Sequence, residues 1–104
     1  MEIKEGVNIQ GLDIVMRPAL IQAEIIWRSL GRPEGVTVTC GMDGTHSAGS
    51  FHYYGRALDF RTRYFDDTTK IRAFKMLKDN LDSNLYTVVL EKTHIHVQYD
   101  RKGA

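Results

Sequence analysis

Two runs of strand-forming residues, LYTVVLE (85–91) and HIHVQYD (94–100), follow one another in the last quarter of the sequence. Both are rich in β-branched and aromatic residues, which favour an extended backbone. Because the runs are consecutive, the sequence predicts an antiparallel hairpin. Residues two positions apart on a strand face the same side. We therefore expect His94, His96 and Gln98 on one face and the intervening apolar residues on the other.

A helix is predicted upstream, over residues 18–30. Pro18 suits a first helical position, and Gly31 suits the residue just after a helix end. The apolar side chains recur at helical spacing and should form the buried stripe: Leu20, Ala23, Trp27 and Leu30, with Ile21 and Ile25 beside them.

The middle of the chain predicts two short strands, 36–40 and 57–62, and a second helix over 68–82. Asp66 or Asp67 can cap that helix, because a carboxylate accepts hydrogen bonds from the unpaired amides of its first turn. Its expected buried stripe is Ile71, Phe74, Leu77 and Leu81. The predicted fold class is α+β, with one small antiparallel sheet and helices packed on it.

Composition limits what such a domain can do. A chain of 104 residues is one domain by length, and we treat residues 1–104 as a single unit. The 14 basic and 13 acidic residues form no basic stripe, so we expect no nucleic-acid partner. Cys40 is the single cysteine, which excludes an intrachain disulfide and a zinc site built from several thiolates.

Targeting signals are not evident in the sequence. The first ten residues, MEIKEGVNIQ, contain no apolar run or cleavage-like segment, so we expect no secretory signal and a product that is cytoplasmic as synthesised. No stretch approaches the ~18–20 apolar residues of a membrane span.

The segment that enters the second strand carries metal-binding side chains. It reads Ser50-x-His52-x-x-Gly55-x-Ala57-x-Asp59. Imidazole nitrogen and carboxylate oxygen are both ordinary zinc ligands. The small residues between them allow the backbone to fold closely, so that both side chains can reach one ion. A histidine and an aspartate at this spacing are nevertheless often ordinary core or surface residues.

The hairpin supplies the remaining candidate ligands, His94 and His96. Taken alone, they are also consistent with two solvated histidines on an exposed face. Combined with His52 and Asp59, they offer three imidazoles and one carboxylate. Three ligands plus a water molecule form an open, catalytic zinc site, whereas four form a closed, structural one. Whether the zinc site is catalytic or structural depends on whether His94 binds the metal.

Glu91 is the candidate general base, because a carboxylate near the metal can accept a proton from bound water. In one unbroken strand Glu91 would point away from His94 and His96. The chain must therefore turn at Lys92 and Thr93, so that Glu91 ends one strand and His94 begins its partner. The competing interpretation is a solvated glutamate at a hairpin tip.

Two motifs in this order resemble a known family. SFHYYGRALDF is similar to the S-x-H-x-x-G-x-A-x-D signature of the zinc D-Ala-D-Ala carboxypeptidases, a group that includes D-Ala-D-Ala dipeptidases and phage L-alanyl-D-glutamate endolysins. EKTHIHV resembles the downstream E…H-x-H element of the same group. The resemblance covers roughly residues 12–100 and implies the fold that these peptidases share with the hedgehog signalling domain.

The resemblance also implies roles for individual residues. The expected cofactor is Zn²⁺, held by His52, Asp59 and His96. Glu91 would be the general base, and His94 would lie beside the metal and hold the substrate or the transition state. An assignment of the third ligand to His94 stays open, because Glu91 would then stand three residues before the ligand, as the acid does in the dipeptidases.

Substrate contacts are less clearly indicated. Relatives often carry an arginine in the loop before the first ligand, and CGMDGTHSAGS has none. His46, Arg56 or Arg61 can supply a donor instead, and Ser50 would orient His52 or the Asp59 carboxylate.

The resemblance implies hydrolysis of peptidoglycan stem peptides, by a carboxypeptidase or by an endolysin-type endopeptidase. Such a protein would act on the cell wall after release by another protein, or as part of a virion. The alternative is a non-catalytic, zinc-stabilised binding domain of the same fold.

Overall fold

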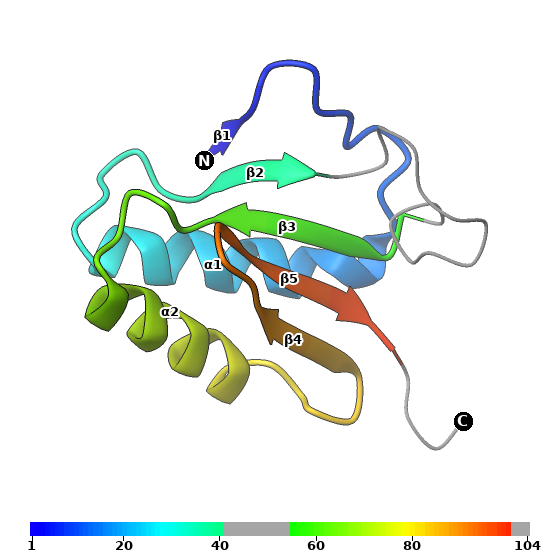
Figure 1. Ribbon diagram of the computed structural model, residues 1–104. Coiled ribbons are helices and arrows are strands. Elements are labelled where there is room, and N and C mark those ends of the chain that lie inside the picture. The colour runs from blue at the N-terminus through cyan, green and yellow to red at the C-terminus, as the bar shows by residue number, and fades with distance from the viewer. Residues whose placement is uncertain (41–54, 101–104) are drawn as a thin grey trace.

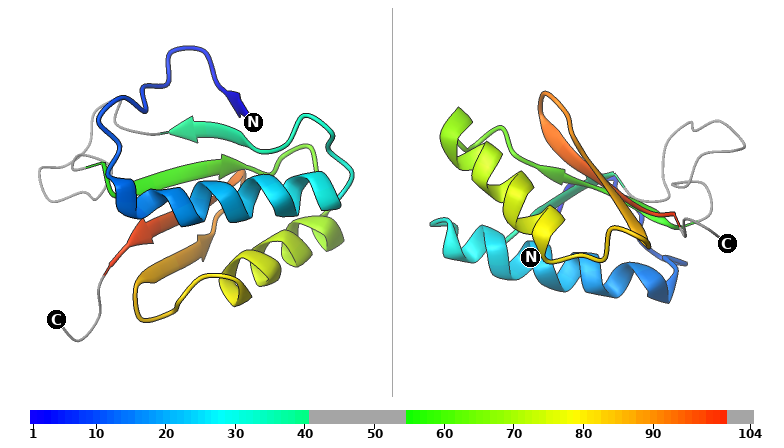
Figure 2. Two further views of the ribbon diagram at one scale, coloured as in Figure 1. Left: turned by 180° about the vertical axis from the view of Figure 1, so that it is seen from behind. Right: turned by 90° about the horizontal axis from the view of Figure 1, so that it is seen from below.

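The computed structural model describes residues 1–40 and 55–100, and it places both helices on one face of a five-stranded sheet (Figures 1 and 2). The spatial order of the strands is β1-β2-β3-β5-β4. The strands are β1 (Glu2–Ile3), β2 (Thr37–Cys40), β3 (Ala57–Arg61), β4 (Tyr86–Leu90) and β5 (His94–Tyr99). The helices are α1 (Arg17–Ser29) and α2 (Asp67–Asp79). The α+β class is therefore confirmed.

The sheet is mixed, which corrects the prediction of an antiparallel sheet. β2, β3, β5 and β4 pair in antiparallel fashion, but β1 pairs with β2 in parallel. Long-range backbone bonds hold this edge strand, from Glu2 N–H to the Val36 carbonyl at 2.8 Å and from Lys4 N–H to the Val38 carbonyl at 2.9 Å. A two-residue strand has no alternation to recognise, so only its partner reveals it.

Helix α1 confirms the predicted element to within one residue at each end. A short 3-10 turn, Ile14–Met16, leads into it, and the Asp13 carboxylate caps that turn by accepting from Val15 N–H at 3.1 Å. Gly31, with a φ of 100°, follows the helix end. The buried stripe consists of Ala19, Ala23, Ile26 and Trp27. Ile21 and Ile25 lie outside it, each 56% exposed.

Helix α2 begins as expected, with the Asp66 carboxylate accepting from Thr69 N–H at 2.7 Å. It ends at Asp79, three residues before the predicted end at 82, where the Asn80 side-chain amide donates to the Met76 carbonyl at 2.7 Å. The prediction for Ile71 is wrong, because that side chain is 43% exposed. Ala73 and Leu77 are the buried residues of this helix.

The core lies between the helices and one face of the sheet. Trp27 of α1 is fully buried, and its ring contacts Phe60 of β3 edge-on, with centroids 6.0 Å apart. Its indole N–H also donates to the Arg61 carbonyl at 3.0 Å. These contacts fix β3 against α1. None of the helices in residues 1–40 and 55–100 is long and apolar enough to cross a membrane.

Candidate functional site

Asp59 and His96 meet on the sheet face that carries no helix. They are direct partners in the register of β3 and β5, and opposed residues of an antiparallel pair point to the same side. The Asp59 Oδ1 atom lies 2.8 Å from His96 Nδ1. Both side chains are mostly buried, with 14% and 20% of their side-chain surface exposed. Two predicted zinc ligands, one from each motif, are therefore in direct contact.

His94 lies beside this pair. It follows the strand alternation and is the register partner of Arg61 on β3. Its Nε2 atom is 3.8 Å from the second oxygen of Asp59, and its Nδ1 atom is 3.3 Å from the Thr93 hydroxyl. One carboxylate thus faces both histidines, and His96 makes the shorter contact. The expectation that His94 and His96 share a face is confirmed, because the intervening Ile95 is fully buried on the opposite side.

Gln98 holds the other side of the His96 ring. Its Oε1 atom lies 2.8 Å from His96 Nε2, so both ring nitrogens have an oxygen partner. Burial acts to lower the pKa of His96, but the hydrogen bonds to Asp59 and Gln98, together with the negative charges of Asp59 and Glu91, raise it overall. The contact with Gln98 also fixes the orientation of the His96 ring.

Glu91 lies where the hairpin argument requires it. β4 ends at Leu90, and Glu91 N–H donates to the His94 carbonyl at 2.9 Å, closing the turn through Lys92 and Thr93. The register, in which Leu90 faces Ile95, continues to place Glu91 opposite His94. Glu91 therefore belongs to the same sheet face as the two histidines, as the predicted turn at Lys92 and Thr93 requires.

Three predicted site residues lie in the segment 41–54, outside the described residues: His46, Ser50 and His52. Within residues 1–40 and 55–100, no group of three His, Cys, Asp or Glu side chains is arranged to hold a metal ion. The predicted ligand set needs His52, so this observation does not test it.

The chemistry of the described pair suits zinc. A carboxylate oxygen and an imidazole nitrogen are both zinc ligands, and the contact between Asp59 and His96 brings these donors to one place. Gln98 resembles the outer hydrogen-bond partner that orients a metal-bound histidine. The proton on His96 Nδ1 that bonds to Asp59 must leave if this nitrogen is to bind a metal.

The two arginines considered for substrate contacts lie in different surroundings. Arg56 forms an ion pair with Asp13, with Nε 3.0 Å from Oδ2. Arg61 instead lines a cavity that also includes Asp59. Sequence reasoning missed two further cations of this cavity, Lys4 and Arg63. Alternation from Asp59 through Arg61 points to Arg63, whereas Lys4 depends on the unpredicted strand β1.

No known family model matches the chain, and no curated protein matches it either.

Proposed function

We propose that this protein is a zinc-dependent peptidase that hydrolyses peptidoglycan peptides, as a D-Ala-D-Ala carboxypeptidase or as an endolysin-type endopeptidase. The observation that carries the proposal is the contact of Asp59 with His96, with Glu91 directly after the neighbouring strand β4 and on the same face. Residues from the two sequence motifs that carry the family resemblance thus lie next to each other.

The metal would be held by Asp59, His96 and His52. Bound zinc supplies Lewis acidity, which polarises a peptide carbonyl and lowers the pKa of a bound water molecule to about 7. Gln98 keeps the His96 ring oriented through its 2.8 Å contact. The apolar residues on the back of β5, Ile95 and Val97, are fully buried and hold the strand that carries the site.

Glu91 would accept a proton from the attacking water and return it to the leaving amine. Its exposed position at the strand end leaves the carboxylate accessible to a substrate that approaches the open face of the sheet. His94 would donate a hydrogen bond to the substrate. Its ring is already oriented by the Thr93 hydroxyl and faces the same carboxylate as His96.

Digestion of purified peptidoglycan tests the proposal directly. Zinc-loaded wild-type protein should release new amines, and mass analysis of the products identifies the bond that is cut. Glu91→Gln should lower kcat/KM by about 10²–10⁴-fold, because it removes the proton acceptor, while leaving the bound zinc in place. Glu34→Gln is a matched control, since Glu34 is exposed in the connection between α1 and β2.

A zinc-loaded wild type that releases no peptide or amine would overturn the peptidase assignment. If that protein still binds zinc and melts at a higher temperature with it, the domain is a zinc-stabilised binding module. If zinc neither copurifies with the protein nor raises its melting temperature, the ligand assignment itself is wrong.

A further inference from the structure

A polar cavity of about 210 Å³ opens next to Asp59, on the same sheet face as the histidines. Its described lining comes from four parts of the fold. Lys4 follows β1, Thr39 belongs to β2, and Arg61 and Arg63 belong to β3 and the residues just after it. Thr93, in the turn before His94, lies at its other side. The cavity therefore adjoins the end of the hairpin where Glu91 and His94 lie.

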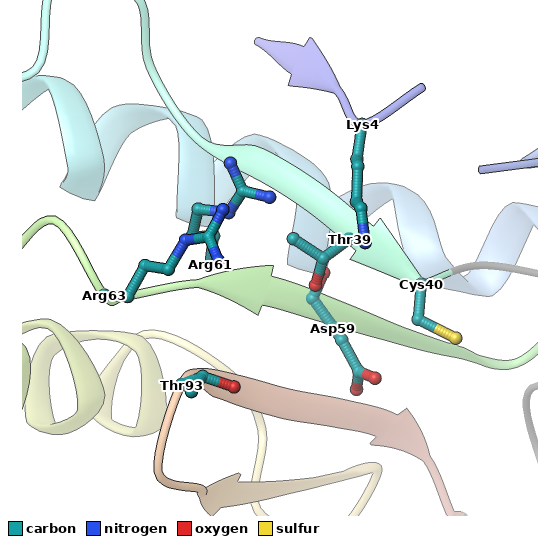
Figure 3. Close-up of a pocket in the computed structure, with 7 residues that line it drawn as sticks. All are labelled: Lys4, Thr39, Cys40, Asp59, Arg61, Arg63 and Thr93. Atoms are coloured by element: carbon teal, nitrogen blue, oxygen red, sulfur yellow. The ribbon is translucent and has the colours of Figure 1, made fainter. Parts of the chain in front are cut away.

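The charge in this cavity is unbalanced. Among the residues that the structure describes, three cationic side chains line it, against the single carboxylate of Asp59. Figure 3 shows that carboxylate turned toward β5, whereas Arg61 and Arg63 extend toward β2 and Lys4 reaches toward Thr39. Asp59 is in fact engaged by His96. Its charge is therefore shared with the histidines and does not offset the arginines fully.

The arginines of the cavity also differ from others in the fold. Arg28, Arg32 and Arg56 each form an ion pair with a carboxylate, at 3.2, 2.7 and 3.0 Å. In the part of the chain that the structure describes, Arg61 and Arg63 take part in no ion pair. Like charges that line one cavity repel each other, and a bound anion would remove that repulsion.

A carboxylate is the anion that the proposed peptide substrate offers to this cavity. Guanidinium groups present planar pairs of donors that match the two oxygens of a carboxylate. The hydroxyls of Thr39 and Thr93 can donate further hydrogen bonds to the same group.

We propose that Lys4, Arg61 and Arg63 form a subsite that binds a carboxylate of the peptide substrate next to the scissile bond. The inference rests on the proposed peptidase function for its placement beside the reacting bond. The segment before His52 contains no arginine. The subsite would supply the cationic contact in its place. The subsite would select acidic stem peptides over their amidated forms.

Binding measurements test the subsite without relying on turnover. A peptidoglycan stem peptide with a D-glutamate α-carboxylate and a C-terminal carboxylate is titrated into metal-free and zinc-loaded protein by calorimetry. Two further peptides carry an amide at one of these positions each. We expect one amidated peptide, and only one, to bind about tenfold or more weakly than the parent, because it loses charge-assisted hydrogen bonds. The weaker peptide identifies which carboxylate occupies the cavity.

Substitutions of the two cavity arginines test whether the preference for a carboxylate over an amide arises in the cavity. Arg61→Gln and Arg63→Gln should weaken binding of the parent peptide but not of the sensitive amidated peptide, and should raise KM more than they lower kcat. Arg72→Gln is the matched control, because Arg72 is exposed on α2 and does not line the cavity. The comparison of peptides on the wild type remains decisive even if a variant does not fold.

Equal binding of all three peptides would overturn the proposal. If hydrolysis occurs without dependence on either carboxylate, the subsite is wrong and the peptidase function stands. If carboxylate-selective binding occurs without hydrolysis, the subsite stands and the peptidase function is wrong.

Discussion

The two faces of strands β3 and β5 have opposite characters, although they are built from alternating residues of the same segments. Four side chains that face the helices are fully buried and apolar: Leu58, Phe60, Ile95 and Val97. Four side chains on the other face are polar and partly exposed: Asp59, Arg61, His94 and His96. One face provides the stability of the domain, and the other provides the groups that can carry chemistry.

The first face determines the geometry of the second. Because side chains alternate along a strand, a slip of one residue between β3 and β5 would bring polar groups into the core. Burial of the apolar set therefore enforces the register in which Asp59 faces His96. The site is positioned by residues that do not touch it, and substitutions on the two faces should have separable effects.

The largest effect on stability should come from the helix-facing side. Phe60→Ala should lower the free energy of unfolding by about 3–5 kcal/mol, because it removes a fully buried ring and leaves a cavity beside Trp27. Urea unfolding measures the loss. Ile71→Ala is the control, since this side chain is 43% exposed and its truncation should cost much less. Equal losses for both variants would show that the burial of Phe60 does not set the stability.

A smaller and separate effect is expected on the open face. Gln98→Ala should weaken binding of the proposed zinc ion by about 10–100-fold, because the His96 ring loses the partner that orients it. The unfolding free energy of the metal-free protein should change by less than about 1 kcal/mol, the usual worth of one hydrogen bond.

Competition with a zinc-binding indicator measures that affinity. Gln10→Ala, a change of the same kind at an exposed position before α1, should leave the affinity unchanged. An unchanged zinc affinity for Gln98→Ala would mean that Gln98 does not support the proposed metal centre.

The sequence predicts much of this division because the signals are local. Alternation in HIHVQY separates the histidines from the buried residues. Pro18 and Gly31 mark helix ends through their backbone preferences, and Asp66 does so through its capping carboxylate. Local patterns alone do not predict the contact between Asp59 and His96, because it also requires β3 to pair with β5. The family resemblance implied that the two side chains meet at one metal ion, but the pairing of β3 with β5 was not predicted and is shown by the register.

Other features depend on contacts between distant segments, which local patterns do not record. β1 exists because Glu2 and Lys4 bond to the backbone near β2, so the position of Lys4 in the cavity could not be predicted. Ile71 has helical spacing with Phe74, and Phe74 with Leu77, yet the helix turns Ala73 toward the core. Helical periodicity limits the choice of buried face but does not select it.

The helix-facing side of the sheet also contains a buried polar group, the hydroxyl of Tyr86. Tyr86 of β4 is buried among core residues, and its hydroxyl donates to the Val15 carbonyl at 2.6 Å. Tyr86→Phe should lower the free energy of unfolding by about 1 kcal/mol near neutral pH, because it leaves that carbonyl without its partner. Urea unfolding at about pH 8 measures this loss.

The same tyrosine predicts a pH dependence with a definite sign. Burial raises the pKa of Tyr86, and the nearby Tyr99 and Asp82 raise it further. The folded state therefore holds the phenol proton more tightly than the unfolded chain, whose tyrosines titrate near about pH 10. This contribution to stability is complete below about pH 10 and is lost as the pH rises through the folded-state pKa. The loss caused by Tyr86→Phe should consequently shrink between about pH 8 and about pH 11. A difference between wild type and variant that stays constant over this range would show that the pKa of Tyr86 is the same in the folded and unfolded states, and that Tyr86 contributes only its hydrogen bond.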